Sequence, residues 1–169
     1  GVADRPLWNT ETGWYVVRPR LAADGKQLAG ALSEADAAAS VARAFVLARA
    51  AGVSRFYWYS WDNDDTGFAD REGHVRAPGR ALAEVQAWLV GAQLDGCRRA
   101  ADGVWSCGLR RDGHAQWIVW TPRGRVEMRL PRRWRIASRR DLSGHVRPVP
   151  ADALSIEIGS VPQLLESAE

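Results

Sequence analysis

The chain has 169 residues, a mass of 18.6 kDa and a formal net charge of +3. Its length suits one domain or two small ones and excludes a large multidomain enzyme. With 46% hydrophobic and 25% charged residues the composition is that of a globular protein, and no apolar run approaches the roughly 20 residues that cross a membrane. We therefore expect a folded chain without a membrane partner.

The first predicted elements are a strand and a helix. Residues 6–10 indicate a short buried strand that ends at Glu11. Residues 33–51 then follow helical spacing, with Ser33 as the N-cap and Gly52 as the stop.

A second strand and a second helix come next. Residues 53–61 are nearly all aromatic or β-branched, which suits a strand covered on both faces. Residues 78–91 predict a helix with Pro78 in its first turn. The order strand, helix, strand, helix predicts parallel strands with helices outside them.

From residue 97 the pattern changes to short strands between turns, typical of an all-β unit. The predicted strands are 104–109, 116–121, 126–130, 134–137, 146–149 and 154–158. We therefore expect an α/β part over residues 1–96 and an all-β domain over residues 97–169.

The two cysteines, Cys97 and Cys107, flank a polar stretch that contains the turn signal Asp102-Gly103. This spacing fits a disulfide across a hairpin, which requires an oxidising compartment. Two unpaired buried thiols are the alternative. A second Cys/His pair at ligand spacing is missing, so a zinc site is not expected.

Two charged segments suggest a calcium site and a nucleic-acid-binding surface, but each is better explained without a ligand. Residues 62–67 partly imitate a calcium loop, yet position twelve is Gly73 where a bidentate Glu is needed. The basic run over residues 123–140 is typical of nucleic-acid binding or of a charged outer sheet face. Pro122, Pro131 and Glu127 interrupt the positive charge and favour the sheet face. We expect no metal, no cofactor and no nucleic-acid partner.

Functional groups of parallel α/β sheets gather at the carboxyl ends of the strands. Glu11 ends the first predicted strand and Trp61 the second. A carboxylate can attack or stabilise an oxocarbenium-like carbon, and an aromatic ring stacks on the apolar face of a sugar. These residue types together indicate carbohydrate chemistry.

The segment from Trp8 to Trp14, WNTETGW, also resembles the strand-7 nucleophile segment of retaining (β/α)8-barrel glycoside hydrolases, the clan with cellulase-like, β-xylosidase-like and iduronidase-like families. The likeness continues in the same order along nearly the whole chain. Residues 37–48 resemble helix 7, 56–62 strand 8, 80–82 the start of helix 8, and 117–120, 140–144 and 158–165 the β-sandwich appended to many such barrels.

The resemblance implies Glu11 as the nucleophile of a double displacement. It also implies a sugar-binding cleft. The residues expected to bind the carbohydrate substrate are Trp61, Trp14, Trp8, Tyr59 and Asn63.

The acid/base partner of this family sits on strand 4, commonly in an Asn-Glu pair, and no Asn-Glu dipeptide occurs in the chain. A complete barrel also takes about 250 residues. The resemblance therefore implies the last two β/α units of a TIM barrel followed by a small antiparallel β-sandwich. Such a chain needs the missing N-terminal barrel portion for activity.

The alternative is a non-catalytic carbohydrate-binding or structural module that uses its Trp rings as platforms. The disulfide and the substrate class favour a secreted or periplasmic location.

Overall fold

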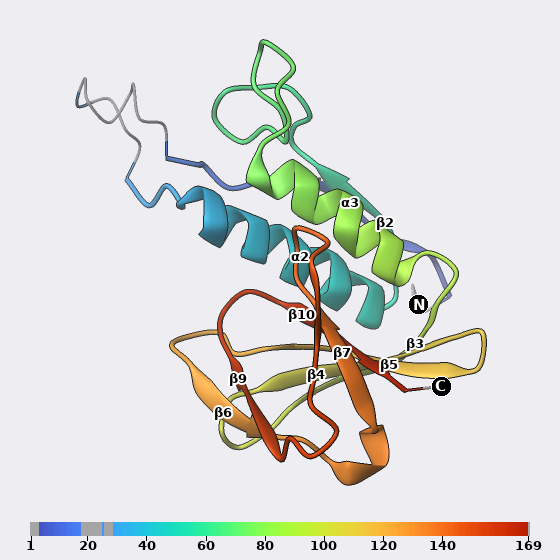
Figure 1. The fold of residues 1–169 in the computed structure, drawn as a ribbon. Coiled ribbons are helices and arrows are strands. Elements are labelled where there is room, and N and C mark those ends of the chain that lie inside the picture. The colour runs from blue at the N-terminus through green and yellow to red at the C-terminus, as the bar shows by residue number, and fades with distance from the viewer. Residues whose placement is uncertain (1–3, 18–24, 26–28, 169) are drawn as a thin grey trace. The chain divides into compact units, whose positions relative to one another are not determined.

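The computed structural model describes residues 4–17, 25 and 29–168. The chain divides into two compact units, Gly1–Leu82 and Ala83–Glu169, which are described separately below (Figure 1). The division expected at residue 96 from sequence stays a prediction. In the described part of the chain, no helix is both long and apolar enough to span a membrane.

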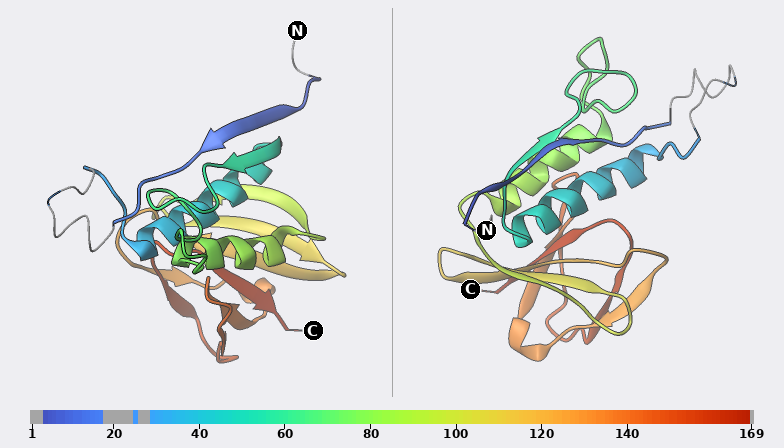
Figure 2. Two further views of the ribbon diagram at one scale, coloured as in Figure 1. Left: turned by 90° about the horizontal axis from the view of Figure 1, so that it is seen from above. Right: turned by 180° about the vertical axis from the view of Figure 1, so that it is seen from behind.

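The first unit contains a parallel pair of strands, β1 (Leu7–Thr12) and β2 (Val53–Trp58). Helix α2 (Glu34–Ala50) connects them, because parallel neighbours need a long crossover (Figures 1 and 2). The pairing brings Thr12 opposite Trp58 at the carboxyl ends of the strands. The predicted order of strand, helix and parallel strand is confirmed.

Helix α2 begins as the sequence predicts. The Oγ atom of Ser33 accepts a hydrogen bond from the backbone N–H of Asp36 at 3.1 Å, which satisfies a free amide of the first turn. Phe45 packs on Phe56 of β2, with ring centroids 4.7 Å apart, so α2 covers one face of the strand pair. The buried residues of the helix are small or β-branched: Ala37, Ala38, Ala39, Val41, Ala42 and Val46.

Strand β2 is shorter than the predicted strand over residues 53–61. After the hydrogen bond from Tyr59 N–H to the Thr12 carbonyl (2.7 Å), two backbone hydrogen bonds close within the loop that follows. The amide of Ala69 donates to Trp61 and that of Gly67 to Asn63. Trp61 therefore lies beyond the strand end, because the loop satisfies its backbone groups locally.

The second predicted helix is observed as α3 (Ala77–Leu89). Its carboxyl end is capped within the second unit by Arg111, because a guanidinium both satisfies free carbonyl groups and complements the helix dipole. The Nη2 atom of Arg111 donates to the carbonyl oxygens of Ala87, Trp88 and Val90 at 2.7, 3.0 and 2.9 Å.

The second unit contains a six-stranded antiparallel sheet in the order β3-β4-β5-β10-β7-β8 and a two-stranded sheet, β6-β9 (Figure 1). The strands are β3 (Gln93–Arg99), β4 (Trp105–Arg111), β5 (His114–Trp120), β6 (Val126–Arg129), β7 (Ile136–Arg140), β8 (Val146–Pro148), β9 (Ser155–Ile158) and β10 (Gln163–Ser167).

Side chains from both sheets form one apolar core. Its buried members are Val104, Val119, Met128, Ile136, Val149, Ile156, Ile158 and Leu165. The expected mixture of an α/β part with a multi-stranded antiparallel sheet is confirmed.

The strand predicted over residues 134–137 is wrong at its start. The chain forms a short 3-10 helix, η1 (Arg132–Trp134), and Arg135 then adopts a left-handed conformation with φ of 47°. Trp134 stacks on Trp117 with ring centroids 4.3 Å apart, so ring packing outweighs the strand preference of this segment.

The predicted disulfide is confirmed. Strand β3 has no counterpart in the sequence prediction, because this edge strand is largely polar. It pairs with β4 so that Cys97 lies directly opposite Cys107, with Cα atoms 4.0 Å apart and a sulfur–sulfur bond of 2.00 Å. The hairpin turns at Gly103, whose φ of 87° favours glycine.

Replacing Cys97 and Cys107 together by Ala should lower the free energy of unfolding by about 2–3 kcal/mol, because the cross-link restricts a short loop of the unfolded chain. Urea denaturation measures the loss. Dithiothreitol should produce the same loss in the wild type and none in the double variant. A wild-type midpoint that reduction does not move would contradict the stabilising role.

Candidate functional site

The candidate site lies at the carboxyl ends of β1 and β2. Glu11 is exposed, and no described residue forms a hydrogen bond or ion pair with its carboxylate. Beside it, the Thr12 hydroxyl donates to Asn9 Oδ1 at 2.8 Å, which restrains the end of the strand. Within the described part of the chain, Glu11 thus presents a carboxylate without a partner on a strand that is paired with β2.

Glycine is required where β1 leaves the sheet. A Cβ atom at Gly13 would lie 2.3 Å from the carbonyl oxygen of Tyr59. The two strand ends therefore approach closely only because Gly13 has no side chain. This contact positions Trp14 next to the end of β2.

Aromatic rings gather around Trp58, and we call Trp14, Trp58, Trp61 and Phe68 the Trp58 cluster. The Trp14 and Trp58 centroids are 5.1 Å apart, and Phe68 stacks on Trp58 at 5.0 Å. Trp61 meets Phe68 edge-on at 6.2 Å. The Trp58 indole N–H donates to the Thr66 carbonyl at 3.0 Å, so this ring is locked in place.

The two outer rings of the cluster differ in exposure from the inner ones. Trp61 is 63% exposed and Trp14 is 38% exposed, whereas Phe68 is buried. The outer rings therefore present apolar surface to solvent while they contact the inner rings. The structure brings together the predicted residues Trp14 and Trp61 through Trp58 and Phe68.

Asn63 shapes the loop after β2. Its Oδ1 atom accepts hydrogen bonds from the amides of Asp65 (2.9 Å) and Thr66 (2.7 Å) and from the Thr66 hydroxyl (3.2 Å). Gly67 packs against the same turn, where a Cβ would lie 2.2 Å from the Asn63 carbonyl oxygen. Asn63 therefore holds Thr66, whose carbonyl accepts the hydrogen bond from the Trp58 indole. The predicted contact of Asn63 with a substrate stays a prediction.

Trp8 and Tyr59 lie outside the Trp58 cluster. Trp8 is opposite Arg55, near the amino ends of the strands, and the Arg55 guanidinium lies 4.5 Å from its ring centroid. Tyr59 follows β2 directly and is 56% exposed. Both rings are accessible, and their predicted part in sugar binding stays a prediction.

Arg76 fastens the loop after β2 to the start of α2, a link that sequence reasoning missed. Its Nε and Nη2 atoms donate to Glu34 Oε1 at 2.8 and 2.6 Å, and Nη1 donates to the Asp64 carbonyl at 3.2 Å. Glu34 Oε2 also accepts from the Ala77 amide at 3.1 Å. The partners are far apart in sequence, so no local pattern could reveal them.

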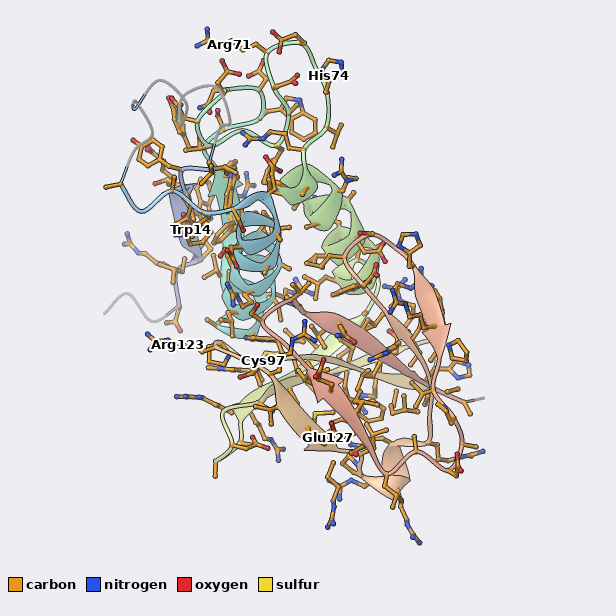
Figure 3. The ribbon with its side chains drawn as sticks, turned by 60° about the vertical axis from the view of Figure 1, so that its left-hand side comes forward. Trp14, Arg71, His74, Cys97, Arg123 and Glu127 are labelled. Atoms are coloured by element: carbon orange, nitrogen blue, oxygen red, sulfur yellow. A yellow bond between two sulfur atoms is a disulfide. The ribbon has the colours of Figure 1, made fainter. Side chains whose placement is uncertain are left out.

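A group of potential metal ligands stands at the tip of the same loop, where Figure 3 shows Arg71 and His74. The ligand atoms of Asp70, Glu72 and His74 lie within 4.8 Å of one another. The amide of His74 donates to Asp70 at 2.8 Å, and this bond holds the pKa of Asp70 below its ordinary value. The group could hold a cation, but hydrogen bonding within the loop explains its geometry equally well.

Replacing Arg76 by Met should cost about 2–3 kcal/mol of unfolding free energy, because the Arg76 side chain is only 11% exposed and its loss leaves charged and backbone partners unpaired. Urea denaturation followed by Trp fluorescence measures this. Arg71→Met is the control, because Arg71 is 73% exposed in its pair with Asp64 and such pairs contribute about 0–1 kcal/mol. Equal losses in both variants would contradict the proposed fastening.

The fold is similar to that of solved glycoside hydrolases. A GH30 endoxylanase from Clostridium papyrosolvens C71 superposes with a TM-score of 0.61 at 12% identity, over 99% of this chain and 43% of that chain. Alpha-amylases from Anoxybacillus and Geobacillus thermoleovorans give TM-scores of 0.48 and 0.47 at 14% and 12% identity, over 96% of this chain and 39% and 38% of theirs.

No protein-family profile and no curated protein sequence matches the chain. The chain spans less than half the length of the solved enzymes it resembles. The endoxylanase likeness defines a glycoside hydrolase-related fold.

Proposed function

We propose that the chain is the C-terminal part of a retaining (β/α)8-barrel glycoside hydrolase. In this proposal β1 with α2 and β2 with α3 are the last two barrel units, over residues 1–96. Residues 97–169 form the appended β-sandwich. An N-terminal portion would supply the other six units and the acid/base.

The observation that carries the proposal is the exposure of aromatic rings on the parallel pair, in the part of the chain that the structure describes. Parallel sheets are normally buried on both faces, and a two-stranded sheet alone is marginally stable. Here α2 covers one face, whereas Trp8 is 48% and Tyr57 46% exposed. Further parallel strands would bury these rings, as closure of a barrel does.

Glu11 is the proposed nucleophile. Its exposed carboxylate at the end of β1 would attack the anomeric carbon and form a glycosyl-enzyme intermediate. A second carboxyl group about 5–5.5 Å away must first protonate the leaving oxygen and then activate water. In this proposal that group comes from the other barrel strands, so the isolated chain has little or no turnover.

The proposed sugar platform is Trp61, with Trp14 beside it. Trp61 exposes most of its ring while Phe68 supports its edge. Trp8, Tyr59 and Asn63 are proposed as outer contacts of the cleft. A secreted or periplasmic location is proposed from the disulfide, because such bonds persist in oxidising compartments.

A carbohydrate-binding module without catalysis is the second candidate. The 63% exposure of Trp61 favours it, because rigid exposed Trp rings are sufficient to bind sugars. The two candidates differ in whether Glu11 forms a covalent bond with the sugar.

In a chain that includes the N-terminal portion, Glu11→Gly should lower kcat on an activated aryl glycoside by about 10⁴-fold or more, because the nucleophile is lost. Sodium azide should restore turnover and yield a glycosyl azide of inverted configuration. Asp62→Gly, which removes an exposed carboxylate in the adjacent loop, is the control. It should keep the wild-type kcat, and azide should not change that kcat.

A 2-deoxy-2-fluoro glycoside should label Glu11 covalently, which peptide mass spectrometry detects. Full activity of Glu11→Gly would reject the nucleophile. Sugar binding that depends on Trp61, without turnover or labelling in the longer chain, would favour the binding module.

A further inference from the structure

The second unit contains a polar cavity of about 350 Å³ apart from the proposed catalytic site. It lies where the β7–β8 pair meets the β5–β6 and β9–β10 connections. Its charged or amide-bearing lining residues are Arg125, Arg139, Asp141, His145, Arg147, Glu157 and Gln163.

Part of this charge is already balanced. Arg125 Nη1 pairs with Glu157 Oε1 at 2.5 Å. Asp141 Oδ1 accepts from the amides of Ser143 at 2.8 Å and His145 at 3.1 Å, which closes the β7–β8 turn. Among the arginines of the cavity lining, these contacts do not involve the guanidinium groups of Arg139 and Arg147.

Arg139 and Arg147 lie directly opposite each other on β7 and β8. Directly opposite side chains of an antiparallel pair share one face, with Cβ atoms about 4.5–5.5 Å apart, so two like charges there repel. Neither guanidinium has a hydrogen bond or ion pair to any part of the chain that the structure describes. Arg139 is also half-buried, which raises the cost of leaving its charge uncompensated.

We propose that this cavity binds an acidic saccharide, with the carboxylate of a uronate between Arg139 and Arg147. A carboxylate would neutralise the repulsion, and the arginine fork matches its two oxygens. The cavity volume lies in the range that holds a small ligand.

The surrounding groups favour a sugar acid over a polyphosphate chain. The carboxylates of Asp141 and Glu157 line the cavity and would repel a run of phosphates. The two carboxylates can accept hydrogen bonds from hydroxyl groups of the ligand. The side-chain amide of Gln163 can donate a hydrogen bond to a hydroxyl oxygen of the ligand. The ligand therefore has a single anionic group and several hydroxyls; its saccharide nature rests on the proposed function, whereas the anion site rests on the two arginines.

Binding to the full chain is measured by NMR of the arginine Nε–Hε signals, with sodium glucuronate, glucose and sodium sulfate as probes at constant ionic strength. Glucuronate should shift the signals of Arg139 and Arg147 and saturate at millimolar concentration. Glucose should leave them unchanged, and sulfate should bind more weakly than glucuronate because it lacks the sugar ring.

Arg139→Gln and Arg147→Gln should each weaken glucuronate binding at least about tenfold, because each removes a charge-assisted hydrogen-bond donor. Arg133→Gln is the matched control: it removes one exposed positive charge outside the cavity lining and should bind like the wild type. Arg147→Gln should also raise Tm by about 1–3 °C at low salt, because it relieves the like-charge contact.

Absence of glucuronate binding, or equal losses in Arg133→Gln and the cavity variants, would overturn the site. Sulfate binding as tight as glucuronate binding would overturn the saccharide assignment. These measurements need no turnover, so failure of Glu11 as nucleophile leaves them unaffected. Conversely, hydrolysis by the longer chain without glucuronate binding would reject this inference alone.

Discussion

The parallel pairing of β1 with β2 is the constraint on which the first unit depends. It requires the crossover that α2 provides, and it aligns Thr12 with Trp58 at one end of the sheet. Because Gly13 allows the strand ends to approach, Glu11 and Trp58 lie at adjacent strand ends. In the part of the chain that the structure describes, Trp8 and Tyr57 of the same pair remain about half exposed.

Hydrogen bonds hold the loop after β2 and the aromatic rings beside it in place. Asn63 organises the turn, its partner Thr66 holds the Trp58 indole, and Arg76 ties the loop to Glu34 at the start of α2. Phe68 packs against the exposed ring of Trp61, and these hydrogen bonds hold the loop from which the ring projects.

Aromatic stacking, the disulfide and charge pairing organise the second unit. Trp105 stacks on Trp120 at 5.6 Å and Trp117 on Trp134 at 4.3 Å, so four of the nine Trp residues of the chain pack against one another in this unit. The arginines of the basic run over residues 123–140 differ in their surroundings. Arg125 pairs with Glu157, Arg139 lines the cavity, and Arg140 lies within 4.0 Å of carboxylates on α3 and β10.

The sequence by itself determined the helix start at Ser33, the strand, helix and strand order, the hairpin disulfide and the carboxylate at a strand end. These depend on neighbours in the chain: caps, periodicity and turn residues act over a few positions. Only the tertiary structure decided that β2 ends at Trp58, that Arg76 bonds Glu34, and that Arg139 faces Arg147. Those outcomes depend on strand register and on contacts between distant segments, which no local pattern encodes.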